Sequence, residues 1–322
     1  IYTGEDTLSL HDALPIWVYG YESPTPGMRD FAIELFKSCY AMGTNGNAKL
    51  TAEALVFLKR WKDSRQYAAS FETLSEQCAE TLGIEQDLSK RDFRALLELD
   101  YFEIVDRKII VDLVQGVATR TLSAGDVAVW VRQRRQGHWY ADYTDLYSAI
   151  EVAAAFIYTL EGAQLTMTSL ADGVQKYTRS WYKLDQLYRK FIFHARQSGQ
   201  ASLLADINTQ VENLYSNKFL LDLNDQWQAF VDNAPLWDAP PIVLQRRFFE
   251  HWVRPFVERR GKVCVLISDA FRYEIGEELQ TLMRQEDRFE AELEPALAML
   301  PSYTQLGMAA LLPNKTLTLV DN

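Results

Sequence analysis

The 322-residue sequence has little cysteine and no long apolar run. Its three cysteines, Cys39, Cys78 and Cys264, are far apart, which argues against a disulfide framework or a zinc ribbon. No stretch approaches the roughly 20 apolar residues of a membrane span, and the first residues lack the basic and apolar regions of a signal peptide. We therefore expect a cytoplasmic protein that makes no contact with a membrane.

Positive charge is also in the minority, since 33 Lys and Arg stand against 44 Asp and Glu, a formal net charge of −11. A protein that wraps nucleic acid by charge alone is normally basic, so this class is excluded and any nucleic-acid contact must be local. One cluster of cations allows a nucleic-acid substrate: Arg246, Arg247, Arg254, Arg259, Arg260 and Lys262.

The remaining composition is that of a folded globular protein. Hydrophobic residues make up 48% of the chain and charged residues 24%, which excludes a disordered or collagen-like chain. A chain of this length predicts roughly two domains.

The N-terminal two thirds of the chain divide into two parts. Residues 1–16 show neither a strand nor a helix pattern, and TLSLHDALPI within them resembles translated sequencing-adaptor DNA, so we interpret 1–16 as non-native. Residues 17–232 repeat apolar side chains at three- and four-residue spacing, which predicts a mainly α N-terminal and middle region. Cys39 is expected in its core. The segment 101–114 permits a hairpin or a helix, and we favour the helix.

A proline-rich linker, 233–241, marks the predicted domain boundary, because three prolines in seven residues form a rigid connector. Residues 242–260 predict a basic, aromatic helix. The pattern after the linker is typical of a different fold class, and we assign 242–322 to the beginning of an α/β domain.

The α/β prediction rests on an alternation of strands and helices. The run VCVLI at 263–267 is typical of a central parallel strand buried on both faces. A helix over 272–285, strand patterns at 289–293 and 297–300, and a short helix over 305–312 follow it. Strand, helix and strand in this order open a doubly wound α/β domain.

Asp269 directly follows the predicted strand 263–267. Its carboxylate would therefore emerge at the carboxyl edge of a parallel sheet, where α/β folds bind their ligands. The alternative is that Asp269 only caps the next helix, and spacing alone gives both interpretations similar weight.

A hydroxyl-rich turn, with Ser302 and Thr304, precedes the short apolar helix. Free N–H groups and the positive end of the helix dipole stabilise an alkoxide or a phosphate, so a hydroxyl there can be a nucleophile for phosphoryl transfer. Thr304 is better placed than Ser302. From spacing alone an ordinary N-cap is favoured for these hydroxyls.

Two segments carry a family resemblance: ISDAFRYEIGEEL at 267–279 and ALAMLPSYTQLGMAALLPNKTL at 296–317. Over residues 262–315 the chain resembles the start of the PglZ domain, in the alkaline phosphatase superfamily, as found in PglZ type A proteins of type 1 BREX phage-defence systems. The helical region also resembles the N-terminal and middle region of PglZ proteins, with less distinctive motifs. The resemblance implies a metal-dependent phosphatase or phosphodiesterase (a hydrolase) that acts in phage defence.

The resemblance also implies roles for single residues. In the superfamily a strand-end aspartate binds a divalent metal, usually Zn, and a Ser or Thr at a helix start is the nucleophile or metal-bridging hydroxyl. Asp269 is thereby implied as a metal ligand and Thr304 as the catalytic hydroxyl and a metal-binding group, with Ser302 as the alternative. A carboxylate suits such a cation, whose charge would hold the hydroxyl as alkoxide.

Part of the superfamily pattern is missing. The further Asp and His ligands of the superfamily lie well downstream, whereas all four histidines here precede Asp269, namely His11, His138, His194 and His251. We therefore expect a truncated alkaline-phosphatase-like domain whose remaining metal ligands are not in this chain, and a fragment that is inactive alone.

The resemblance implies other BREX components as partners, including a DNA methyltransferase and ATPase-like proteins. The alternative function is a non-catalytic interaction scaffold of a defence complex, with aromatic-rich helices that bind a partner and a degenerate PglZ domain. Retention of downstream Asp and His ligands would favour the enzyme.

Overall fold

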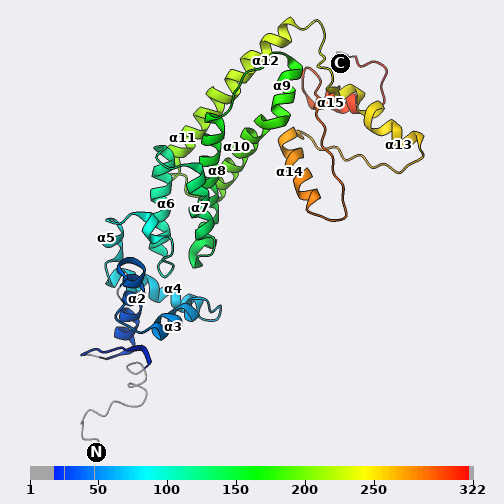
Figure 1. Ribbon diagram of the computed structural model, residues 1–322. Helices are drawn as coiled ribbons and strands as arrows, with labels where there is room; N and C mark the ends of the chain where they lie inside the picture. Colours follow the sequence, from blue (N-terminus) through cyan, green and yellow to red (C-terminus); the bar gives the residue numbers. More distant parts are fainter. Residues whose placement is uncertain (1–17, 25, 47, 319–322) are drawn as a thin grey trace, which may run out of the picture. The chain divides into compact units, whose positions relative to one another are not determined.

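The computed structural model describes residues 18–24, 26–46 and 48–318, which form two compact units (Figure 1). Unit 1 contains the described residues up to Ala155 together with Phe191–Thr209, and unit 2 contains Phe156–Lys190 and the residues from Gln210 onward. The units divide within helices and not at the proline-rich segment, so the domain bounds expected from the sequence stay a prediction. The segment 1–16, interpreted as non-native, lies outside the described residues.

Unit 1 is built from helices, as its apolar spacing predicts. Its elements are α2 (Met28–Asn45), α3 (Ala52–Lys62), α4 (Ala68–Thr81), α5 (Ile84–Leu88), the 3-10 turn η1 (Phe93–Leu96), α6 (Glu103–Ala118), α7 (Ala124–Arg134), the 3-10 turn η2 (His138–Tyr143), most of α8 (Thr144–Glu161), the end of α10 (Tyr182–Gln197) and the start of α11 (Ala205–Asn213). The helix favoured for 101–114 is confirmed as part of α6.

The centre of unit 1 is aromatic. Phe36, Phe71 and Phe102 are fully buried, and the ring of Phe36 lies 5.6 Å from that of Phe71 and 5.5 Å from that of Phe102 between centroids. Cys39 is buried on α2, the helix that also carries Phe36, and burial raises the pKa of its thiol to about 12. Its predicted place in the core is confirmed.

A buried ion pair joins α6 to α7 within unit 1. Arg134 and Asp106 are both almost completely buried, and the guanidinium Nε donates to Oδ1 of Asp106 at 3.1 Å while Nη2 binds Oδ2. The same guanidinium donates to the carbonyls of Leu97 and Leu99, each at 2.9 Å, and the Tyr147 hydroxyl donates to Asp106. Since every charged atom has a partner, the desolvation cost of this pair is offset.

The helical part of unit 2 contains α9 (Leu170–Lys176), the π-helical turn η3 (Tyr177–Trp181), the first part of α10, the π-helical turn η4 (Leu214–Leu220) and α12 (Leu221–Asn233). Each π turn contributes a tyrosine to one buried carboxylate. Tyr215 donates to Oδ1 of Asp185 at 2.7 Å, and Tyr177 donates to Oδ2. Burial raises the pKa of both phenols, so they remain donors. These bonds link both π turns to α10.

The rest of unit 2 is less regular. It contains β1 (Val243–Leu244), the 3-10 turn η5 (Gln245–Arg247), the π turn η6 (Phe249–Val253), α13 (Arg254–Glu258), α14 (Tyr273–Arg284), β2 (Ala296–Leu297) and α15 (Thr304–Leu311). β1 and β2 pair in parallel, with Val243 opposite Ala296. Leu244 and Leu297 of this pair are buried with Leu170 of α9. The predicted fold class, a mainly α region followed by the beginning of an α/β domain, is confirmed.

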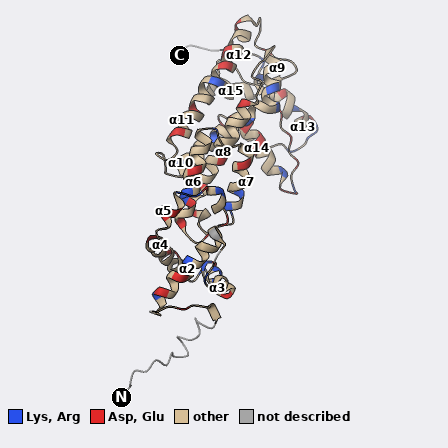
Figure 2. Cartoon of the chain, turned by 60° about the vertical axis from the view of Figure 1, so that its left-hand side comes forward, with Lys and Arg blue, Asp and Glu red and all other residues tan. Residues whose placement is uncertain are grey.

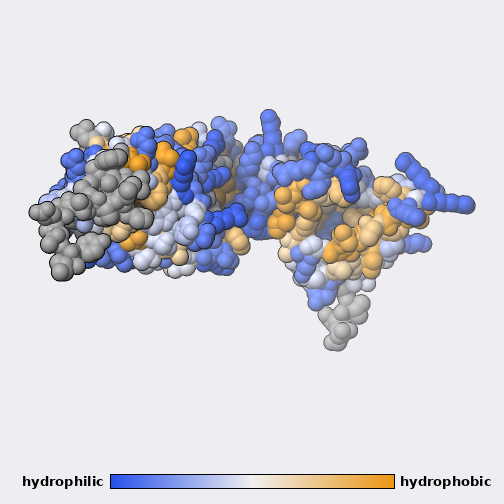
Figure 3. All heavy atoms as spheres, turned by 90° about the horizontal axis from the view of Figure 1, so that it is seen from below, coloured by the Kyte–Doolittle hydropathy of each residue, from blue (hydrophilic) through white to orange (hydrophobic). Residues whose placement is uncertain are grey.

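The central strand predicted over 263–267 is wrong. These residues are exposed and take no part in a sheet, and Leu266 is 92% exposed. A central strand needs a hydrogen-bonding neighbour on each side. Across the described ranges the only ladder is β1 with β2, so 263–267 has no neighbour to pair with. Val263, Val265 and Ile267 are each more than 40% exposed, and Figure 3 shows apolar surface on the later part of unit 2. Of the strand patterns at 289–293 and 297–300, only Leu297 lies in a strand, as the second residue of β2.

The single helix predicted over 242–260 is also wrong. In the structure this segment begins with β1, continues through the turns η5 and η6, and ends with the five-residue α13. Pro255, which has no N–H to donate, lies at the start of α13, where that loss costs least.

Two further findings concern the surface of the described residues. Acidic and basic positions are interspersed along the helices (Figure 2). None of the helices in this part of the chain is both long and apolar enough to cross a bilayer.

We expect Arg134→Ala to destabilise unit 1 by about 3–5 kcal/mol, because it leaves the Asp106 carboxylate buried without a counter-charge. Urea unfolding followed by circular dichroism measures the change. Arg132→Ala is the matched control, since Arg132 is exposed on the same helix and should change stability by less than about 0.5 kcal/mol. Equal effects of the two substitutions would show that the buried pair is not an anchor.

Candidate active site

An open cavity of about 1040 Å³ lies within unit 2. Its lining comes from two groups of segments. The helical part contributes residues of α9, η3 and α12, among them Trp181 and Trp227, and the later part contributes 267–273, 293–299 and the turn at the start of α15. Asp269, Ser302 and Thr304 all line it, so the structure brings together the three residues that the sequence singled out.

Asp269 lies in a strained turn. Its Oδ1 accepts a hydrogen bond from the backbone N–H of Ala270 at 3.0 Å, and Ala270 has a φ of 53°. A residue with a Cβ is uncommon in this left-handed conformation, and such strain gathers at functional sites. The residue that precedes α14 is Arg272, with no side-chain cap. The alternative that Asp269 only caps this helix is therefore wrong.

The two hydroxyls are exposed at the start of α15. Thr304 is the first residue of the helix, Tyr303 is the residue before it, and no side chain caps this end. Neither Ser302 nor Thr304 uses its hydroxyl in a hydrogen bond with another described residue. The N-cap interpretation of these hydroxyls is therefore wrong, and both are free to interact with a ligand.

Gln245 fixes the hydroxyl turn from both sides. Its side-chain oxygen accepts from the backbone N–H of Met299 at 3.2 Å, and its side-chain nitrogen donates to the carbonyl of Gly307 at 3.3 Å. Met299 precedes the turn and Gly307 lies in α15. A Cβ at Gly307 would lie 3.3 Å from the Gln245 amide, so glycine permits this close approach. Gln245 thereby positions the turn that carries Ser302 and Thr304.

Helix α14, which follows the Asp269 turn, is held by a fully buried carboxylate. Glu274 accepts hydrogen bonds from Nη2 of Arg189 and of Arg272, both at 2.9 Å. Arg189 also binds Glu278, which accepts from Lys190 at 2.9 Å. Burial opposes ionisation of Glu278, but the hydrogen bonds from Arg189 and Lys190 outweigh it and lower the pKa of this carboxyl. These bonds join α14 to α10 inside unit 2.

Four carboxylates that follow Asp269 already have side-chain partners within the chain. Glu274 and Glu278 are neutralised by the cations of the chain, and Glu277 accepts a hydrogen bond from Gln186 at 3.2 Å. Glu294 lines the cavity and accepts from the indole N–H of Trp252 at 2.8 Å. Asp269, the other carboxylate of the cavity, has no side-chain partner among the described residues and accepts only from the backbone N–H of Ala270.

The residues present do not complete a metal centre. Within the described ranges no group of three His, Cys, Asp or Glu side chains could hold an ion. His138 contacts Glu72 at 3.0 Å and His194 contacts Asp145 at 2.8 Å, so these imidazoles have partners in unit 1. One carboxylate and two hydroxyls are fewer ligands than a zinc or magnesium site requires.

Sequence reasoning missed the residues that position the site. Arg189 and Gln245 were not singled out, although Gln186 and Arg189 lie three residues apart on one face of α10 and both contact the start of α14. That spacing was a detectable signal. The contribution of Trp181 and Trp227 to the cavity could not be predicted, because no local sequence pattern indicates which helical side chains line a cavity.

Comparison with known proteins agrees with this picture. Residues 248–322 match the family described as the BREX system PglZ alkaline phosphatase-like domain. The chain is 29% identical over 327 residues to the alkaline phosphatase-like protein BrxZ of Escherichia coli O9:H4 (strain HS), covering 92% of this chain and 38% of the relative. It is 26% identical over 275 residues to the alkaline phosphatase-like protein PglZ of Bacillus cereus (strain H3081.97), covering 84% and 32%. No solved structure matches the chain.

The family resemblance drawn from the two sequence segments is therefore confirmed: residues 248–322 match the PglZ domain, and most of the chain aligns with two PglZ-type proteins. The PglZ match begins at residue 248 and includes Asp269, Ser302 and Thr304. The chain spans about a third of the length of the curated relatives it matches.

We expect Arg189→Ala to loosen α14, because Glu274 then loses one of its two guanidinium partners while it stays buried. The cost should be about 1–3 kcal/mol. Hydrogen–deuterium exchange measures it as faster exchange of the amides of 273–284. Lys183→Ala, at an exposed cation of the same helix, should leave this exchange unchanged. Unchanged protection of 273–284 in both variants would contradict the anchoring role.

Proposed function

We propose that this chain supplies the helical region and the beginning of the catalytic domain of a metal-dependent phosphatase or phosphodiesterase of the PglZ type in BREX bacteriophage defence. The observation that carries the proposal is the shared cavity of Asp269, Ser302 and Thr304, inside the segment that matches the PglZ family. The names of both relatives support the same assignment.

In this proposal Thr304 is the nucleophile, with Ser302 as the alternative. Its hydroxyl lies at the first residue of α15, where the N–H groups of the first turn have no intrahelical acceptor. These groups and the helix dipole stabilise negative charge on an attacking oxygen and on a phosphoryl group. The free hydroxyl of Thr304 is consistent with this role.

Asp269 is the proposed ligand of a divalent metal, with Zn as the expected ion. A carboxylate free of ion pairs is a suitable oxygen donor. The metal would supply electrostatic stabilisation of the phosphoryl oxygens. Because the remaining ligands are not among the described residues, the chain by itself is proposed to be inactive.

A nucleic-acid substrate is supported by the basic cluster. Its members Arg246, Arg247, Arg259, Arg260 and Lys262 are exposed, and none forms an ion pair with a described residue, whereas Arg254 binds Glu250. Cations that have no partner inside the chain remain available to phosphates. Further proposed partners are other BREX components, namely a DNA methyltransferase and ATPase-like proteins.

A second candidate function, the non-catalytic scaffold, is favoured by one observation. Leu266, Phe256 and Val257 are each more than half exposed in unit 2. Large apolar side chains that are left this exposed are typical of a face that is covered in an assembly. The scaffold and the enzyme differ in whether Asp269 and Thr304 matter for defence.

We expect no phosphodiester hydrolysis by the purified 322-residue chain with Zn²⁺, Mg²⁺ or Mn²⁺, because its residues hold at most part of a metal centre. Release of nitrophenolate from bis(p-nitrophenyl) phosphate is the measurement. The Asp269→Ala chain is the control for contaminating activity. Zinc-stimulated hydrolysis that depends on Asp269 would overturn the proposed inactivity.

In the complete gene product, we expect Asp269→Ala and Thr304→Ala each to abolish phage defence, measured as efficiency of plating. Thr304→Ser should restore part of it because it retains a hydroxyl at the same position. Ser302→Ala should keep defence, since its hydroxyl is the lesser candidate. Circular dichroism and co-purification control for folding and assembly. Full defence by both alanine variants would favour the scaffold.

A further inference from the structure

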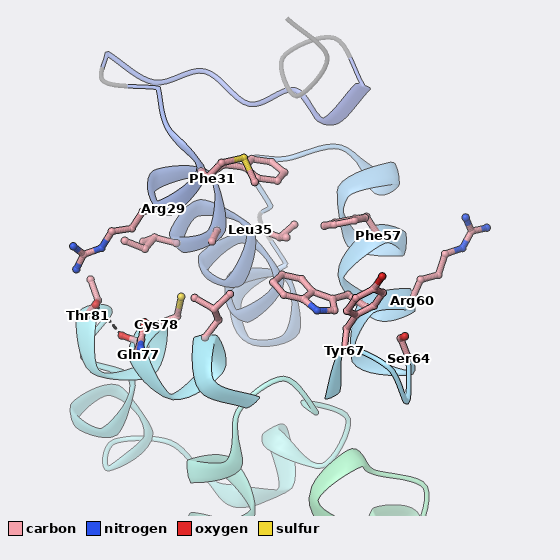
Figure 4. Close-up of a pocket in the computed structure, with 15 residues that line it drawn as sticks. Arg29, Phe31, Leu35, Phe57, Arg60, Ser64, Tyr67, Gln77, Cys78 and Thr81 are labelled. Carbon is pink, nitrogen blue, oxygen red and sulfur yellow. Dashed lines mark hydrogen bonds between the residues drawn. The ribbon is translucent and has the colours of Figure 1, made fainter. Parts of the chain in front are cut away.

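Unit 1 contains a second apolar groove that the proposed chemistry does not use. It is an open cavity of about 610 Å³ between α2, α3 and α4 (Figure 4). Side chains of Phe31, Leu35, Phe57 and Trp61 form its apolar surface. Its residues belong to unit 1 alone, so it is separate from the cavity of Asp269.

The groove is an apolar surface left open to water. Met28 is 78% exposed, Tyr67 53% and Phe57 38%, although all three line it. Phe31 and Phe57 both contact the ring of Tyr19 on one side, and Trp61 contacts Phe71 of the core. The groove is therefore joined to the aromatic core through Trp61, while Met28, Tyr67 and Phe57 keep apolar surface open at its mouth.

The charges of the groove are all positive. Its lining includes Arg29 and Arg60 and no carboxylate, in a chain whose net charge is −11. Figure 4 shows the two guanidinium groups on opposite sides of the apolar floor. Neither arginine forms an ion pair with a residue in the described part of the chain. The groove is thus complementary to an occupant that is apolar in the middle and acidic at both ends.

The one reactive group in the groove is held inactive. Burial raises the pKa of the Cys78 thiol, although the nearby Arg29 lowers it. A thiol with a raised pKa is a poor nucleophile and a poor metal ligand. The chemistry of the groove is therefore binding and not catalysis.

We propose that this groove binds an amphipathic helix of a partner protein, with an apolar face at i, i+4 and i+7 spacing and acidic side chains near both ends. Helices are recognised in apolar grooves of this kind through a few apolar anchors. The groove lies open along three helices, and Met28 and Tyr67 extend the apolar surface at its mouth, which suits a helix better than a small enclosed ligand. The proposal does not depend on the proposed enzymatic function.

The test uses the whole chain and a fluorescein-labelled helical peptide of about 14 residues, with leucines at i, i+4 and i+7 and glutamates at both ends. Fluorescence anisotropy measures its binding. We expect saturable binding that Arg29→Glu with Arg60→Glu weakens by about tenfold or more. A second peptide carries lysines in place of the glutamates. We expect it to bind the unchanged chain more weakly than the glutamate peptide does, and to bind the double variant more tightly. Lys59→Glu, at an exposed cation of α3 outside the groove, is the matched control.

The possible results distinguish an acidic helix from other occupants of the groove. Reversal of the peptide preference by the double substitution supports the proposal, and circular dichroism confirms that the variants fold. Three results overturn the proposal. The first is that neither peptide binds saturably, and the second is that Lys59→Glu weakens peptide binding as much as the double substitution does. The third is that dodecanoate binds saturably whereas neither peptide does. The last result would identify the groove as a site for a small apolar anion.

Discussion

The burial of one carboxylate, Glu274, governs how the PglZ segment meets the helices that precede it in unit 2. A buried carboxylate without a counter-charge is expensive, so α14 can pack only where Arg189 and Arg272 reach it. Gly276 restricts the packing of α14 sterically, because a Cβ at this position would come within 2.9 Å of the Leu293 side chain. The turn with Asp269 immediately precedes this helix. The chain therefore places its candidate metal ligand through contacts that are outside the ligand's own turn.

Much of the helical region could be predicted because its signal is local. The spacing of apolar residues predicted the helix that became part of α6, and it placed Cys39 in the core. The paired charges were not predictable, since Arg134 and Asp106 are 28 residues apart and nothing in the intervening sequence announces their contact. The π turns at Tyr177 and Tyr215 were missed for a similar reason: both positions read as ordinary helix.

The errors in the α/β part have one physical origin. A run such as 263–267 has the composition of a buried strand, but composition cannot supply the neighbours that make a strand. Hydrogen-bond partners come from other segments, and the described residues provide a parallel partner only for Val243–Leu244. The candidate site was predictable to a greater extent. Asp269 and Thr304 follow motif and position, whereas Gln245, which fixes the hydroxyl turn, is visible only through its contacts with Met299 and Gly307.

The charges that line the cavity of Asp269 and Thr304 do not by themselves suit an anionic ligand. A phosphoester is anionic, and the lining presents it with the unpaired carboxylate of Asp269 and with Glu294. Arg272 is the lining cation, but its guanidinium is already bonded to Glu274. A negative pocket repels a phosphoester, and the N-terminus of α15 offers only a partial positive charge in compensation. Any phosphoryl transfer at Thr304 therefore requires additional positive charge next to Asp269, from groups that the described residues do not contribute.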